Sequence, residues 1–140
     1  MKNKLKIHTT NYFDTFIKVA EDTKANKGTR PIRKGDKKSV GEMQYEMIAE
    51  NPYYYTSDDL IFHVFAQRND LKPEDQEARK VYFSKGRPCL RTSPLAKNYG
   101  FGIHHDNYGK VALYGMETNE YQNFLDNDMV KKIKAMRSTK

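Results

Sequence analysis

The sequence contains a single cysteine, Cys89, and no tryptophan among its 140 residues. One cysteine excludes an intrachain disulfide and fits a reducing environment. No stretch approaches the roughly 18 apolar residues of a membrane span. The start, Met1 to Lys6, lacks the apolar stretch of about 7–15 residues that is typical of a signal peptide. We therefore expect a cytoplasmic protein that does not enter a membrane.

Complete catalytic and metal-binding motifs are also missing. The four histidines and the one cysteine form no HxxxH, HExxH or CxxC spacing, and no GxSxG occurs. The segment Lys34-Gly35-Asp36-Lys37-Lys38-Ser39 does not fit the GxxxxGK[ST] frame of a phosphate loop. These absences predict no metal and no cofactor, and they favour a binding protein over an enzyme.

The apolar content is moderate and rich in aromatic rings. Hydrophobic residues make up 37% and charged residues 31%, and there are ten tyrosines and seven phenylalanines. A chain of this length buries about 68% of the surface that its unfolded form exposes, which suffices for one core. We expect one domain over residues 1–140.

The net charge of +7 is unevenly distributed. A basic N-terminal arm (1–8) carries +3, a basic loop (within 23–38) carries +6 and a basic C-terminal tail (129–140) carries +5, which leaves −7 on the rest. Basic segments of this kind attract nucleic acid or other anions, although short basic tails also serve solubility alone.

The pattern of apolar residues predicts an α+β fold, with four or five helices packed on an antiparallel hairpin or small sheet. Strands are predicted near 101–106 and 110–116. Residues 13–20 fit a strand or a helix, with β-branched residues favouring the strand. Longer helices are predicted over 39–51, from Ser57 onward, over 73–84 and over 118–126. A short helical turn is predicted after Ser93-Pro94, and residues 129–136 are predicted to form a last amphipathic turn or two.

The hairpin can be predicted in detail. A three-residue loop, 107–109, places Gly109 where a left-handed residue is usually needed, and it pairs Asp106 with Lys110. This register gathers Phe101, Ile103, Val111 and Leu113 on one face and Gly102, His104, Ala112 and Tyr114 on the other.

The two adjacent histidines are therefore expected on opposite faces. His105 lies on the core face, where a hydrogen-bonded structural histidine is the ordinary interpretation. His104 lies on the other face near Tyr114, and this pair forms the weak candidate for acid–base catalysis.

Lysines of the basic loop and arginines close to apolar segments provide the candidate anion contacts. An arginine beside a core element can hold a carboxylate or phosphate, or it can form a structural ion pair with a neighbouring aspartate. The candidate ligand-binding residues are Lys34, Lys37, Lys38, Arg68, Arg91 and His104.

Two further features allow a structural and a functional interpretation. Cys89 lies between Arg87 and Arg91, which could lower the pKa of its thiol, but unpaired cysteines are usually small buried residues. The tyrosines at 53–55 could stack on bases or simply pack beside a helix end.

Several segments together resemble a small bacterial family of uncharacterised single-domain proteins. The resemblance rests on KIHTTNYFDTFIKVAED, KGDKKS, QYEMIAENPYYYTSDD, FAQRND, FSKGRPCLRTSPLAKNYGFGIHHD, GKVALYGMET and KAMRS. It covers nearly the whole chain and implies a stand-alone domain, without an activity or a site residue to transfer.

Three functional hypotheses follow. The first is a non-catalytic binding module for an anionic ligand, either nucleic acid or a phosphorylated small molecule. The second is a small enzyme that uses His104 as acid or base. The third is a protein–protein adaptor with an exposed aromatic patch near residues 53–55.

Overall fold

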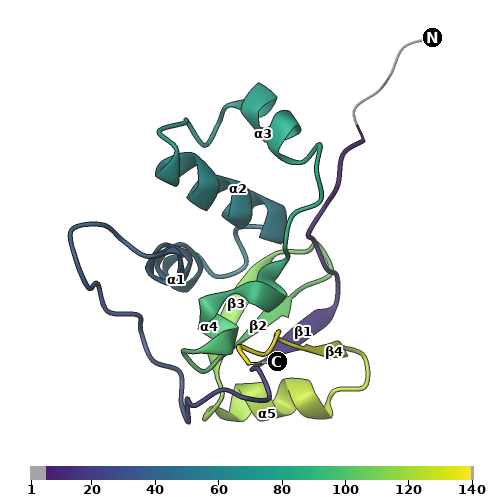
Figure 1. Cartoon of the computed structure of the whole chain (residues 1–140). Coiled ribbons are helices and arrows are strands. Elements are labelled where there is room, and N and C mark those ends of the chain that lie inside the picture. Colours follow the sequence, from purple (N-terminus) through teal and green to yellow (C-terminus); the bar gives the residue numbers. More distant parts are fainter. Residues whose placement is uncertain (1–5, 140) are drawn as a thin grey trace.

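The computed structural model describes residues 6–139 and combines one four-stranded sheet with five α-helices (Figure 1). The expected α+β fold is therefore confirmed. The elements in chain order are β1 (Thr15–Lys18), α1 (Val40–Glu50), α2 (Ser57–Arg68), α3 (Gln76–Tyr82), a 3₁₀ turn (Leu90–Thr92), α4 (Pro94–Lys97), β2 (Phe101–His105), β3 (Val111–Gly115), α5 (Asn119–Asp126) and β4 (Lys131–Lys134).

The sheet has the strand order β3-β2-β1-β4. Strands β1, β2 and β3 pair in antiparallel fashion, whereas β4 runs parallel to β1. The strand interpretation of residues 13–20 is confirmed by β1. The hairpin register is confirmed as well, because His105 pairs with Val111, and the Asp106 N–H donates to the Lys110 carbonyl.

Local sequence signals explain where the helices begin. The Ser39 hydroxyl accepts a hydrogen bond from the Glu42 N–H at the start of α1, and Thr56 with Asp59 forms a complete capping box at the start of α2. Ser93 and Thr118 cap α4 and α5 in the same way. Helix α3 is shorter than the predicted span of 73–84, because Asp75 provides its N-cap.

The prediction of helical turns at 129–136 is wrong, because residues 131–134 form β4. The Lys131 N–H donates to the Asp14 carbonyl and the Ala135 N–H donates to the Lys18 carbonyl, so backbone pairing with β1 replaces a helix. Three lysines in this four-residue strand place charge on an edge of the sheet, which discourages pairing with other chains.

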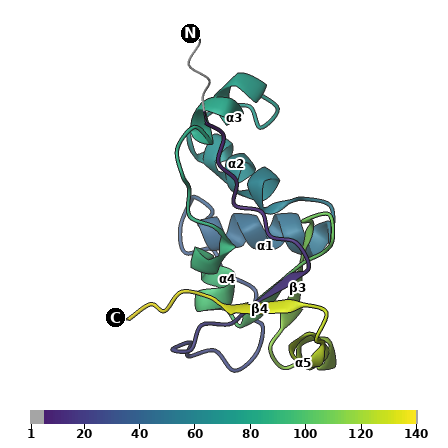
Figure 2. The same ribbon diagram turned by 90° about the vertical axis from the view of Figure 1, so that its right-hand side faces the viewer.

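Helices cover both faces of the sheet (Figures 1 and 2). The main core lies between the sheet and α1, α2 and α4, and it includes Ile17, Ile48, Leu60, Leu95 and Ile103. The opposite face packs on α5 through a smaller cluster around Phe16 and Tyr121. A third cluster packs α2 against the end of α3. Helices α1, α2 and α3 therefore form a stack that extends away from the sheet (Figure 2).

The three basic segments have different structures. Residues 1–5 of the N-terminal arm and Lys140 lie outside the described residues. The loop within 23–38 forms no helix or strand, and its Arg33 and Lys38 pair with Glu42 and Glu46 of α1. In the C-terminal tail, Lys134 and Arg137 both face Glu21, which neutralises part of its charge.

His105 is buried in the main core as expected, but its ring is not hydrogen-bonded. It has no exposed surface, and neither ring nitrogen finds a hydrogen-bond partner within residues 6–139. The ring contacts Tyr12 edge-on, with 5.4 Å between the ring centroids. The prediction of a hydrogen-bonded structural histidine is therefore wrong, and the nearby hydroxyls bond elsewhere: Thr15, opposite His105 on β1, donates to the Phe13 carbonyl, and the Tyr12 hydroxyl bonds to the Cys89 sulfur. Burial lowers the pKa of His105 to about 4.

We expect His105 to make the fold sensitive to acid. The unfolded chain binds this proton near pH 6.5 and the folded chain only near pH 4, so the free energy of unfolding falls as the pH falls between these values. The total loss is about 3 kcal/mol. His105→Leu removes this titration, and urea denaturation from pH 7 to pH 4 should show a flatter profile for the variant. Parallel profiles for the two proteins would contradict this assignment.

Candidate functional site

The basic candidate residues do not gather on one surface. Lys34 and Lys37 line an open hollow beside the start of α1, Lys38 pairs with Glu46 at 2.7 Å, and Arg91 donates to the Lys134 carbonyl at 2.7 Å. Arg68 lies apart from all of these at the end of α2 and lines a separate cavity. Arg68 is therefore the strongest candidate for a ligand contact, because helices α1 and α2, which pack in the main core, form walls of its cavity.

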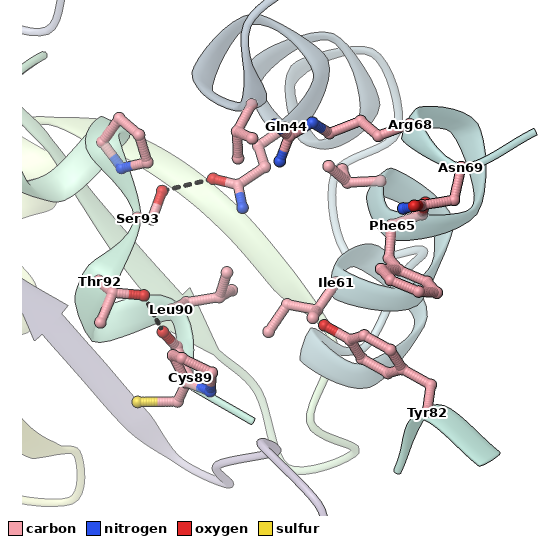
Figure 3. A pocket seen from close by; sticks show the side chains of 14 residues that line it. Gln44, Ile61, Phe65, Arg68, Asn69, Tyr82, Cys89, Leu90, Thr92 and Ser93 are labelled. Atoms are coloured by element: carbon pink, nitrogen blue, oxygen red, sulfur yellow. Dashed lines mark hydrogen bonds between the residues drawn. The ribbon is translucent and has the colours of Figure 1, made fainter. Parts of the chain in front are cut away.

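This cavity lies between α1, α2 and the segment 88–94, and Tyr82 of α3 closes one side (Figure 3). We call it the Arg68 cavity. Its volume is about 220 Å³. Apolar side chains form most of its wall, namely Val40, Ile61, Val64, Phe65, Pro88, Leu90 and Pro94. A mostly apolar wall with a few polar groups is typical of a small-molecule site.

Gln44 brings the first polar group to the Arg68 cavity. The Ser93 hydroxyl accepts a hydrogen bond from the Leu95 N–H and donates its own hydrogen to Gln44 Oε1 at 2.5 Å. Both side chains are buried. This bond uses the carbonyl oxygen of the amide, so the Nε2 donors of Gln44 point away from Ser93, toward the interior of the cavity (Figure 3). Within the described residues, Nε2 has no hydrogen-bond partner.

Arg68 and Tyr82 supply further donors. The Arg68 side chain extends across the cavity so that its guanidinium lies beside Gln44 (Figure 3). The Arg68 guanidinium forms no ion pair with any residue in 6–139, unlike Arg33 and Arg79. The Tyr82 hydroxyl points into the cavity from the opposite wall. Burial raises the pKa of Tyr82, so its phenol stays protonated and can donate a hydrogen bond.

Cys89 lines the cavity with its backbone, whereas its thiol points away (Figure 3). The sulfur lies 3.1 Å from the Tyr12 hydroxyl. Burial and the contact with Cys89 raise the pKa of Tyr12 to about 12. The thiol therefore faces Tyr12, in the segment before β1, and would not contact a ligand in the cavity.

His104 and Tyr114 meet on the α5 face of the sheet, as the hairpin register predicts. Both connect through Tyr53, whose hydroxyl lies 2.8 Å from His104 Nδ1 and 2.8 Å from the Tyr114 hydroxyl. The His104 ring stacks on Phe124 of α5 at 4.2 Å. Burial lowers the pKa of His104, so the imidazole is neutral at pH 7.

The tyrosines at 53–55 do not form one exposed aromatic surface. Tyr54 is 65% exposed, whereas Tyr53 and Tyr55 are half-buried. Tyr53 has a left-handed backbone with φ of 59°, which is unfavourable for a residue with a Cβ. The bonds of its hydroxyl to His104 and Tyr114 help to hold this conformation.

Sequence reasoning found Arg68 but missed Gln44, Ser93 and Tyr82. Gln44 had a detectable signal, because it shares a face of α1 with Met47 and Ile48 and is a polar residue on the buried side. The sequence pattern around Ser93 indicates only the start of a helix. The inward direction of the Tyr82 hydroxyl depends on the packing of α3 against α2, which no local pattern reveals.

Other kinds of site find no support in the part of the chain that the structure describes. No three side chains of His, Cys, Asp or Glu come together there as metal ligands. No helix over residues 6–139 has the length and apolar composition needed to cross a bilayer.

The chain belongs to a protein family, DUF6157, which is described as a family of unknown function. The family model matches residues 7–140, which is nearly the whole chain. No curated protein and no solved structure matches the chain. The resemblance to an uncharacterised family is thus confirmed, and it assigns no function to any residue.

We expect Tyr53→Phe to destabilise the protein by about 1–3 kcal/mol, because it leaves two half-buried polar groups without their shared partner. Tyr54→Phe is the matched control and should change stability by less than about 0.5 kcal/mol, since that ring is exposed. Urea denaturation measures both. Equal stabilities for the two variants would show that the hydrogen bonds to Tyr53 do not stabilise the fold.

Proposed function

We propose that the protein binds a small organic acid in the Arg68 cavity, without transforming it. The observation that carries the proposal is the unpartnered Nε2 of Gln44, held toward the cavity by the bond from Ser93. This nitrogen lies at the surface of the cavity, where an acceptor on a bound ligand can take its hydrogen bond.

The polar groups that face the cavity favour an anion. The Gln44 amide nitrogen, the Arg68 guanidinium and the protonated Tyr82 hydroxyl can all donate hydrogen bonds, and Arg68 adds a positive charge. A carboxylate carries two acceptor oxygens and pairs well with a guanidinium. A cationic ligand would meet Arg68 with a like charge.

The size and the wall of the cavity favour a small molecule with an apolar body. A volume of about 220 Å³ is below the range of about 300–1,000 Å³ for drug-sized ligands. The apolar walls around Ile61, Phe65 and Leu90 suit a short hydrocarbon or a single ring. Of the two anionic ligands expected from the sequence, the small molecule fits this cavity better than a nucleic acid.

The lining residues also favour binding over catalysis. The cavity wall consists of fourteen residues of the described chain, and none of them is a histidine, an aspartate or a glutamate. The thiol of Cys89 faces Tyr12 instead. His104 has its Nδ1 bonded to Tyr53 and its ring stacked on Phe124, contacts that support a structural role for this residue.

Benzoate and its neutral analogue benzamide test the proposal directly. We expect benzoate to bind saturably and to shift the side-chain NH₂ signals of Gln44 in ¹H–¹⁵N spectra. Arg68→Gln should weaken benzoate binding about tenfold, because a hydrogen bond to a charged group is lost. Lys72→Gln removes one exposed positive charge close to the end of α2, outside the cavity, and should leave the affinity within about twofold.

The proposal is wrong if benzamide binds as tightly as benzoate, or if Arg68→Gln and Lys72→Gln have the same effect. The first result would show that the cavity does not select for charge. The second would show that only the net charge of the protein matters.

A further inference from the structure

Strand β3 forms one edge of the sheet, and this edge is covered only in part. Residues 53–55 run beside its beginning, where the Tyr53 N–H donates to the Val111 carbonyl and the Val111 N–H donates to the Tyr55 carbonyl. At the other end, Gly28 packs against the strand so closely that a Cβ on Gly28 would lie 2.9 Å from the Gly115 Cα.

The middle of the edge is open at Leu113. Along an antiparallel strand, successive residues direct their backbone N–H and carbonyl groups alternately to the strand on one side and to the strand on the other side. Val111 bonds outward to residues 53–55, so Leu113, two residues on, also presents its N–H and its carbonyl outward. The backbone hydrogen bonds at the two ends of the hairpin fit this alternation. The Asp106 N–H donates to the Lys110 carbonyl, and the Met116 N–H donates to the Gly100 carbonyl. Within residues 6–139, neither outward group of Leu113 has a backbone partner.

A cavity of about 330 Å³ lies against this open position. Three consecutive residues, 112–114, line it. Side chains alternate between the two faces of a strand, so lining by three in a row means that the cavity borders the strand edge itself. Its walls include the rings of Tyr45 and Phe101, with Ala49 from the last turn of α1 and Pro52 just after that helix. We call it the Leu113 cavity.

The shape of this edge excludes an added β-strand. A peptide that extends a sheet needs several consecutive open residues. Within residues 6–139, residues 53–55 cover one side of Leu113, and Gly28 packs over Gly115 on the other side, so Leu113 is the position of this edge that offers both a free donor and a free acceptor. A compact ligand that carries a donor and an acceptor on one edge matches this opening.

We propose that the Leu113 cavity binds a nucleobase. The pairing edge of every nucleobase carries an adjacent donor and acceptor, which can bond to the N–H and carbonyl of Leu113. The aromatic rings of Tyr45 and Phe101 offer surfaces for stacking on a flat heterocycle. The Arg30 guanidinium lies 5.4 Å from the Tyr45 ring centroid, close enough to the cavity wall to contact a phosphate on the same ligand. This inference is independent of the Arg68 cavity.

The test uses ¹⁵N-labelled protein titrated with AMP, GMP, CMP and UMP, and with ribose 5-phosphate as the ligand without a base. We expect at least one nucleotide to bind saturably and to shift the backbone amide signal of Leu113. Ribose 5-phosphate should bind at least tenfold more weakly. Arg68→Gln should leave nucleotide binding unchanged, which separates this inference from the organic-acid proposal.

A matched pair of variants locates the site. Ala49 is exposed on α1 and lines the cavity, so Ala49→Trp fills the opening without disturbing the core. Glu50 is exposed beside it and does not line the cavity, so Glu50→Trp is the control. We expect Ala49→Trp to weaken nucleotide binding at least tenfold and Glu50→Trp to change it less than twofold.

Tyr45→Leu, which removes one stacking surface, replaces Ala49→Trp if that variant loses its dispersed spectrum. The inference is overturned if no nucleotide binds, if ribose 5-phosphate binds as tightly as the nucleotides, or if the blocking variant and Glu50→Trp have equal affinities.

Discussion

The register of the β2–β3 hairpin determines on which face of the sheet, or at which edge, its two histidines and its free backbone groups lie. The loop at 107–109, with Gly109 at φ of 81°, pairs His105 with Val111. This places His105 in the main core, His104 beside Tyr53 on the α5 face, and the backbone of Leu113 toward the open edge. A slip by one residue would exchange the faces and bring His104 into the apolar core. The conformation of Tyr53 and the opening at Leu113 both depend on this register.

The helical layer adds the second constraint, because α1 contributes to both cavities from different faces. Val40 and Gln44 face α2 and the segment 88–94, whereas Tyr45 and Ala49 face the edge of β3. The bond between Ser93 and Gln44 ties α1 to the start of α4, which packs on β2. The same bond fixes the amide that faces the Arg68 cavity. A structural contact of the helical layer thus also positions a group with ligand-binding capacity.

Features that depend on neighbouring residues could be predicted from the sequence. The hairpin, the starts of α1, α2 and α5, and the opposite faces of His104 and His105 follow from turn residues, caps and alternation. Strand β4 could not be predicted, because its partner β1 lies more than 100 residues away in the chain and parallel pairing has no turn signal. The Arg68 cavity could not be predicted for the same reason, because residues that line it are far apart in the sequence. Arg68 stood out as an arginine close to apolar residues, but Gln44, Ser93 and Tyr82 come from three other segments, and only their packing brings them together.

The claim that the Arg68 cavity accepts an organic acid is tested most directly by a crystal structure of the protein grown with benzoate. We expect the benzoate ring between Ile61, Phe65 and Leu90, with the carboxylate oxygens within hydrogen-bond distance of Gln44 Nε2 and the Arg68 guanidinium. The contradicting result is an Arg68 cavity that contains no benzoate while benzoate lies against other basic residues of the protein. That result would show that the donors of the cavity do not select the anion.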